Sequence, residues 1–330
     1  MAQFDDYFKN TPKVPKKPLD WNTFWKQQIR ELNKVPIDFK KVEKKKTLSF
    51  KRSERFTEYE YYSIGKYLLK SRLYLPKTTK KKIPVLVIFP DYSETLEDYE
   101  QLTEQGHAVF LLFLRGHDNI YLDDTEEKSK AKNAKSVDDE DPKEEKVTTL
   151  GYFAENLLQK KDYYMRQLYL DAYRSIEALR LLSSIDKTNI AILGKGVGGA
   201  MALFVQYFMP RAHKIILEEP SFINIQEINY QNPSKFAKEI ISYLQKHKAD
   251  NFSIRKNLLY FDPIYFAMDI KIPISMLIDF ELKSNYPKDS FALFHAIKSS
   301  KDMHIFTEDA SKALIKKHNV ITKEMDLIEK

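Results

Sequence analysis

Residues Asn189–Phe204, "NIAILGKGVGGAMALF", combine an apolar run, a glycine-rich turn and a run of helix-forming residues. Gly194, Gly196 and Gly199 fit the pattern G-x-G-x-x-G, in which a strand-to-helix turn binds the pyrophosphate of a dinucleotide. The same residues fit G-x-S-x-G, the turn that presents a catalytic serine, except that Gly196 stands in place of the serine. The first pattern indicates a cofactor site, and the second indicates a hydrolase-type turn that has no nucleophile.

The dinucleotide interpretation has partial support in the sequence. The turn follows an apolar run and opens a helical pattern, and Glu218 and Glu219 end the next apolar run, near where a ribose-binding acid would lie. However, such a fingerprint normally opens a nucleotide-binding domain at its first strand, whereas here several strand patterns precede it. The motif alone leaves both interpretations open, and it is the family resemblance given below that favours the second one, from which we expect no cofactor.

The segments around this turn alternate between strand and helix patterns. Short apolar runs at 83–89, 107–113 and 272–279 are typical of buried parallel strands, and amphipathic stretches separate them. This alternation predicts an α/β fold with a mainly parallel sheet and helices on both faces.

The first part of the chain has a different pattern. Asp20 is placed to cap a helix in which Trp21, Phe24 and Trp25 share one face, and the segments that follow alternate polar and apolar residues as antiparallel strands do. We predict one domain over residues 1–330, in which residues 1–82 form a helical and antiparallel N-terminal extension. Residues 122–146 are almost all charged or polar, so we predict a surface insertion there.

Composition limits the class of protein. A hydrophobic fraction of 43% is enough for a sizeable core, and no apolar run approaches the roughly 20 residues that span a bilayer. The sequence starts without a signal-peptide pattern, so we expect a cytoplasmic protein. It has no cysteine, which excludes disulfides and cysteine nucleophiles, and no spacing of histidines and carboxylates predicts a metal site. The net charge of +7 comes from lysine clusters interleaved with acidic residues, a pattern that argues against nucleic acid as a partner.

The chain resembles the acetyl xylan esterase / cephalosporin C deacetylase family of α/β-hydrolases from "FDDYF" near its start to about "IFTEDASK". "DWNTFW" is similar to the family's entry helix, "PDYSET" to its His-Gly-Tyr turn and "LRGHD" to its Arg-Gly-Gln-Gly turn. The most specific match lies in residues 151–179, where the matching residues are Gly151, Tyr152, Tyr163, Tyr164, Arg166, Tyr169, Leu170, Asp171, Ala172, Arg174 and Glu177. The resemblance implies an α/β-hydrolase fold and a tendency to form ring-like homo-oligomers.

The resemblance also implies a catalytic triad of serine, aspartate and histidine. In this sequence the positions of the nucleophile, the acid and the base fall on Gly196, Leu282 and Ser311. None of these residues has the side chain that its catalytic role requires. The oxyanion hole needs two backbone N–H groups, which by position belong to Tyr92 and Val197. Backbone donors do not depend on the side chain, so this hole could persist.

Other polar residues near these positions are interpreted as structural. Asp279 and Glu281 lie near the aspartate position, and without a histidine to orient we interpret them as exposed loop carboxylates. His304 is expected inside the last strand and His318 well into the helix after it. The remaining histidines are interpreted as strand-end or helix-surface residues: His107, His117, His213, His247 and His295.

The sequence therefore predicts a catalytically inactive relative of these esterases, which binds a small-molecule or carbohydrate-derived ligand or takes part in an assembly. Two alternatives stay open: an active carboxylesterase or deacetylase that uses other residues, and a basic binder of nucleic acid or anionic surfaces. The surroundings of Gly196 distinguish a ligand-binding role from a structural one. An open pocket favours ligand binding, whereas a space filled by side chains such as Phe153 and Leu282 favours a structural role.

Overall fold

The computed structural model describes residues 14–43, 56–92, 99–117, 151–225, 233–280, 287–307 and 310–326. The predicted surface insertion at 122–146 and the triad position Leu282 lie outside these residues. No described helix combines the length and the apolar character that a bilayer crossing requires.

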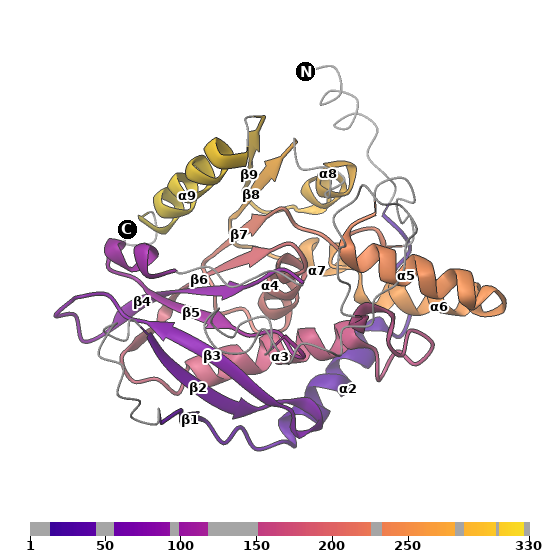
Figure 1. The fold of residues 1–330 in the computed structure, drawn as a ribbon, viewed down its shortest axis with the longest axis horizontal. Coiled ribbons are helices and arrows are strands. Elements are labelled where there is room, and N and C mark those ends of the chain that lie inside the picture. Colours follow the sequence, from indigo (N-terminus) through magenta and orange to yellow (C-terminus); the bar gives the residue numbers. More distant parts are fainter. Residues whose placement is uncertain are drawn as a thin grey trace, which may run out of the picture.

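The described strands form one nine-stranded sheet in the order β1-β2-β3-β5-β4-β6-β7-β8-β9 (Figure 1). The first three strands pair antiparallel with one another and with β5, and all later pairings are parallel. The predicted mainly parallel sheet with an antiparallel N-terminal part is thus confirmed. The strands are β1 (Lys40–Lys41), β2 (Phe56–Tyr62), β3 (Leu68–Tyr74), β4 (Ile83–Phe89), β5 (Ala108–Leu112), β6 (Ile185–Lys195), β7 (Lys214–Glu218), β8 (Ile274–Asp279) and β9 (Lys301–Phe306).

Helices cover both faces of the sheet, as the alternation predicts. Most of them pack on one face, with side chains such as Val87 and Ile192: α2 (Trp21–Asn33), α3 (Tyr164–Leu179), α4 (Val197–Phe208), α5 (Lys235–Lys246), α6 (Asn251–Leu258), α7 (Ile264–Ala267) and α8 (Pro287–Ala296). The other face, with Ile88 and Leu193, is covered by the short 3₁₀ helix η2 (Glu100–Gln105) and by α9 (Ala310–Asp326). The two faces of each central strand are both buried because each contacts its own helical layer.

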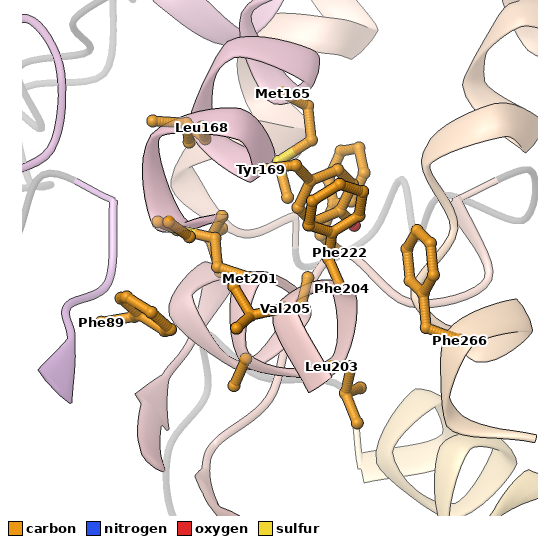
Figure 2. Packing of buried hydrophobic residues seen from close by; sticks show 14 of the residues in the cluster. Phe89, Met165, Leu168, Tyr169, Met201, Leu203, Phe204, Val205, Phe222 and Phe266 are labelled. Atoms are coloured by element: carbon orange, nitrogen blue, oxygen red, sulfur yellow. The ribbon is translucent and has the colours of Figure 1, made fainter. Parts of the chain in front are cut away.

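The main core lies between α3 and α4 on the helix-rich face. Figure 2 shows Tyr169 of α3 beside Phe204 of α4, with Phe266 of α7 nearby. The rings of Tyr169 and Phe204 are stacked with centroids 4.8 Å apart, and the Tyr169 hydroxyl donates a hydrogen bond to the Phe261 carbonyl at 2.6 Å. This bond allows a tyrosine to be fully buried without an unpaired hydroxyl.

Helix α2 is part of this core. Trp21 and Trp25 are both fully buried, and both indole N–H groups donate to the Tyr260 carbonyl at 2.9 Å. Asp20 occupies the predicted N-cap position, and its carbonyl accepts from the Phe24 N–H at 2.8 Å, but its side chain makes no capping hydrogen bond. Its carboxylate instead accepts a hydrogen bond from the Tyr260 hydroxyl, a partner that is distant in sequence.

The residues that carry the family resemblance in α3 mostly hold elements together. Arg115 forms a two-pronged ion pair with the buried Asp171, at 2.8 and 2.9 Å, which fastens the loop after β5 to α3. Arg174 donates to the Leu32 and Val35 carbonyls at 2.6 and 3.0 Å, which satisfies the end of α2. Both arginine side chains thus stabilise the contact between two elements through charge-assisted hydrogen bonds.

Candidate functional site

The glycine turn between β6 and α4 lies flush against the sheet. A Cβ atom on Gly198 would lie 2.0 Å from the Phe89 carbonyl oxygen of β4, and one on Gly194 would lie 2.5 Å from the Gly198 carbonyl oxygen. A Cβ on Gly199 would meet the Pro220 side chain at 3.2 Å. Gly194 and Gly198 are therefore required for close packing of backbone on backbone, whereas Gly199 has a tight contact with a side chain.

Gly196 itself has φ 51° and ψ −118°, a conformation that residues with a side chain rarely adopt. Its N–H donates to the Glu218 carbonyl at 2.9 Å, and its carbonyl accepts from the Ser221 N–H at 3.1 Å. A strand, a sharp turn with positive φ and a helix that begins at the next residue are the geometry of a nucleophile elbow. The elbow is thus formed around a residue that has no side chain.

The space that a nucleophile would occupy is filled by Asp91, which follows β4. A Cβ built on Gly196 would lie 2.0 Å from both Cγ and Oδ1 of Asp91. The same Oδ1 accepts a hydrogen bond of 2.7 Å from the N–H of Val197, the first residue of α4. A carboxylate at a helix N-terminus is favoured by the helix dipole, and its bond to the N–H is charge-assisted.

This contact occupies one of the two predicted oxyanion donors. The Val197 N–H is directed at a carboxylate of the chain, so it is already engaged by a negative charge. Tyr92, the residue expected to supply the other donor, is next to Asp91 in the chain. The structure therefore brings Tyr92, Gly196 and Val197 to one place, together with a carboxylate that the sequence did not single out.

The side chain of Tyr92 faces away into a buried polar network. Its hydroxyl donates to Glu239 Oε1 at 2.9 Å and accepts from the Tyr152 N–H at 3.2 Å. Glu239 also accepts from the N–H groups of Gly151 and Phe153, at 3.0 and 2.8 Å. Burial and the neighbouring Glu239 carboxylate raise the pKa of Tyr92, so the phenol stays protonated.

Phe153 closes the space beside this network. It is fully buried, and its ring centroid lies 4.5 Å from that of Tyr92, 5.6 Å from that of Phe222 and 5.3 Å from that of Phe236. These rings thus form an aromatic cluster around the side chain of Tyr92. Of the two outcomes considered above, the Asp91 carboxylate in front of Gly196 favours the filled one, although by a residue other than Phe153 or Leu282.

The histidine position, Ser311, lies in the first turn of α9, and its side chain is not among those described. As predicted, His304 lies in β9 and His318 in α9. His117 is not a surface residue, which corrects that prediction. It is fully buried beside Tyr92, with ring centroids 5.3 Å apart, and burial lowers its pKa to about 4. The imidazole is therefore neutral at physiological pH.

Asp279 is also not an exposed loop carboxylate. It ends β8, is 3% exposed, and lies 3.6 Å from the ammonium group of Lys317 in α9. Lys317 also pairs with Glu219 at 2.7 Å and with Glu218 at 3.9 Å. The two glutamates that a dinucleotide site would need as ribose ligands instead belong to this ionic cluster.

One cluster of potential metal ligands lies away from the elbow. Ligand atoms of Asp302, His304 and Glu324 lie within 4.8 Å of one another. His304 Nε2 is 2.8 Å from Asp302, Ser275 donates to Asp302 at 2.9 Å, and the Lys214 ammonium forms an ion pair with Glu324. Because a lysine already neutralises Glu324, these contacts make an ion-pair network at the β9 edge of the sheet.

Comparison with known proteins gives a consistent result. The family model described as acetyl xylan esterase (AXE1) matches residues 4–324. Acetyl esterase Axe7A from Xylanibacter ruminicola is 23% identical over 313 residues, which cover 87% of this chain and 62% of that protein. The chain thus spans less than two thirds of the length of this curated relative.

Solved structures show the same fold. The acetyl xylan esterase from Paenibacillus sp. R4 superposes with a TM-score of 0.78 at 18% identity, and covers 98% of both chains. Acetyl xylan esterase 1 from Thermoanaerobacterium sp. JW/SL YS485 gives 0.70 at 18% identity, covering 97% of this chain and 98% of that one. The acylaminoacyl peptidase from Pyrococcus horikoshii gives 0.57 at 16% identity, covering 84% of this chain and 43% of that one. The fold is that of an α/β-hydrolase.

Proposed function

Because the chain belongs to the acetyl xylan esterase family, we propose that it is a member that retains the fold but does not hydrolyse esters. The observation that supports this proposal best is the position of Asp91. Its carboxylate lies where the side chain of a nucleophile would project from the elbow, and it binds the Val197 N–H. A tetrahedral oxyanion would have to displace a negative charge that is already bound at this donor.

The residues at the triad positions support the same proposal. Gly196 has no nucleophile, Leu282 cannot orient a base, and Ser311 cannot accept the proton of an attacking alcohol at neutral pH. Removal of triad members leaves only about 10³–10⁴-fold catalysis over water, which comes from the oxyanion hole and from substrate binding. Because Asp91 is bound at one oxyanion donor, we expect a residual rate enhancement below this 10³–10⁴-fold level.

The role that remains is binding or assembly. A filled site at the elbow favours surfaces elsewhere on the molecule, and the family resemblance favours self-association into a homo-oligomer. Light scattering coupled to size-exclusion chromatography tests this part: a monomer at all concentrations would contradict it. A cytoplasmic location stays a prediction, which fractionation of the source cells would test.

The test of inactivity is an assay with p-nitrophenyl acetate. Purified protein and its Asp91→Asn variant should both hydrolyse this ester at the buffer rate. Turnover that persists through repurification and is lost in Asp91→Asn would overturn the proposal. It would make Asp91 a working carboxylate and favour the alternative of an active esterase with non-standard residues.

A reconstruction experiment tests the reason for the inactivity. Gly196→Ser combined with Leu282→Asp and Ser311→His restores the three triad side chains but leaves Asp91 in the way of the new serine. We expect hydrolysis only when Asp91→Ala is added to these three substitutions. Equal activity with and without Asp91→Ala would show that this carboxylate does not block the elbow.

A further inference from the structure

The last strand and the last helix of the described chain bring three metal-ligating side chains together (Figure 1). Asp302 and His304 are two positions apart on β9, so their side chains lie on the same face of the strand as Phe306, which packs with α9. Glu324 lies near the end of α9 and is 7% exposed. One atom of each of the three side chains lies within 4.8 Å of the other two.

Two of these atoms are close to each other without being hydrogen-bonded. His304 Nε2 lies 2.8 Å from Asp302 Oδ2. Both atoms are closed off from solvent, and neither makes a hydrogen bond to any residue that the structure describes. A buried polar atom without a partner calls for a water molecule or an ion, and one cation bound by both atoms satisfies the two of them at once.

The other oxygen of each carboxylate has a partner of its own. Ser275 donates to Asp302 Oδ1 at 2.9 Å, and the Lys214 ammonium pairs with Oε2 of Glu324. The second oxygen of Glu324, Oε1, lies 3.9 Å from His304 Nε2. Partners on the outer side of a ligand hold it in position and are typical of metal sites. Lys214 therefore orients Glu324 and leaves the oxygen near the histidine available.

The charge and the donor atoms of this cluster determine the class of ion that fits. Two carboxylates and the Lys214 ammonium leave one net negative charge beside a histidine, which attracts a cation. One imidazole nitrogen with two carboxylate oxygens suits zinc, whereas Mg²⁺ and Ca²⁺ prefer oxygen ligands alone. Ligands about 2.1 Å from a tetrahedral ion lie about 3.4 Å apart. The separations of 2.8 and 3.9 Å lie on either side of this value.

From this geometry we propose that Asp302, His304 and Glu324 bind one zinc ion, with water as the fourth ligand. Without the ion, the same side chains form the ion-pair network at the β9 edge. Because the ligands come from both β9 and α9, the bound ion fastens the last helix to the edge of the sheet. No residue of the elbow belongs to this site, so its test is independent of the proposed function.

Isothermal titration calorimetry of the full chain, stripped of metal with EDTA, tests the site with ZnCl₂ and MgCl₂. We expect one Zn²⁺ per chain to bind at micromolar concentration and to raise the melting temperature, because the ion binds the folded state. Mg²⁺ should not bind at the same concentrations. Absence of Zn²⁺ binding at submillimolar concentration, or equal binding of the two ions, would overturn the proposal.

Variants locate the ion. His304→Gln and Asp302→Asn each remove one ligand at a half-exposed position, so they should fold and should weaken Zn²⁺ binding at least about tenfold. Ser275→Ala removes only the outer partner of Asp302 and should weaken binding about 10–100-fold. His295→Gln is the matched control, because His295 is an exposed histidine on α8 outside the cluster.

The control variant should bind Zn²⁺ as the parent does and show the same rise in melting temperature. His304→Gln should melt like the parent without zinc but lose the rise that zinc causes, which a merely structural role of the histidine would not produce. Undiminished Zn²⁺ binding in His304→Gln, or an equal loss in His295→Gln, would contradict the proposal, because the ion would then bind elsewhere.

Discussion

The substitution Gly196→Ala tests the relation between the elbow and Asp91. It adds one carbon atom to a residue with φ 51°, and that carbon would lie 2.0 Å from Asp91 Cγ. The backbone strain of a side chain in such a conformation costs about 1–3 kcal/mol. Asp91 must also move, which breaks its charge-assisted bond to the Val197 N–H at a further cost of about 1.5–3 kcal/mol. We expect a total loss of about 2.5–6 kcal/mol in the free energy of unfolding.

Two comparisons separate these contributions in urea-unfolding experiments. Gly65 has φ 70°, and a Cβ there would meet nothing within 4 Å, so Gly65→Ala measures the strain of positive φ without a clash. Asp91→Ala removes the atoms that clash, so Gly196→Ala in the Asp91→Ala background should cost only the strain. The double-mutant cycle should therefore give a coupling energy of about 1.5 kcal/mol or more.

The result that refutes this reasoning is specific. If Gly196→Ala costs no more than Gly65→Ala, or costs the same with and without Asp91, then Asp91 does not occupy the space in front of the elbow. If Gly196→Ala unfolds at or above the urea concentration of the parent, the positive φ of the turn is also wrong.

Substitutions at three further residues test other parts of the structure by the free energy of unfolding. Trp25→Ala should cost about 3–5 kcal/mol because a fully buried indole is lost; Trp25→Phe should recover part of this, and a loss below about 1 kcal/mol in the alanine variant would contradict it. Burial raises the pKa of Asp262 to about 7, so between about pH 4 and 7 only the native state keeps this proton. The free energy of unfolding therefore falls as pH rises through this range. Asp262→Asn should remove this pH dependence. Burial lowers the pKa of His117 from 6.5 to about 4, so between these pH values only the unfolded state binds a proton on this imidazole. The free energy of unfolding therefore falls as pH falls through this range. His117→Gln should remove this loss. Because the two windows overlap, the two variants should tilt in opposite directions from the parent between pH 4 and 7, and parallel curves would contradict the assignment.

The order of strands and helices could be predicted from the sequence because it depends on local periodicity. The run 83–89 is apolar at every position since β4 is covered on both faces, and the face shared by Trp21, Phe24 and Trp25 is the buried face of α2. The glycine turn could be predicted for a similar reason. Its residues are contiguous, and their close contacts leave no room for side chains.

The surroundings of the turn could not be predicted because they come from distant segments. Asp91 and Val197 are more than 100 residues apart, and only the fold places the carboxylate on the N–H. One signal was present: an acidic residue precedes Tyr92, where the resembling family turn has glycine. Asp279 was misjudged because its partner, Lys317, is on another element. The same holds for Asp20, whose hydrogen-bond partner Tyr260 is about 240 positions away.

The carbonyl of Tyr260, which accepts both indole N–H groups of α2, has a consequence for the biosynthesis of the chain. Trp21 and Tyr260 are separated by 239 positions, so α2 leaves the ribosome long before the part of its binding site that contains Tyr260 exists. At roughly 5–20 residues per second, the delay is about 10–50 s. During this interval the face with Trp21, Phe24 and Trp25 lacks the part of its docking site that Tyr260 and the residues after it supply. A nascent chain arrested before Tyr260 should therefore bind chaperones that recognise exposed aromatic residues, and one arrested well beyond it should release them.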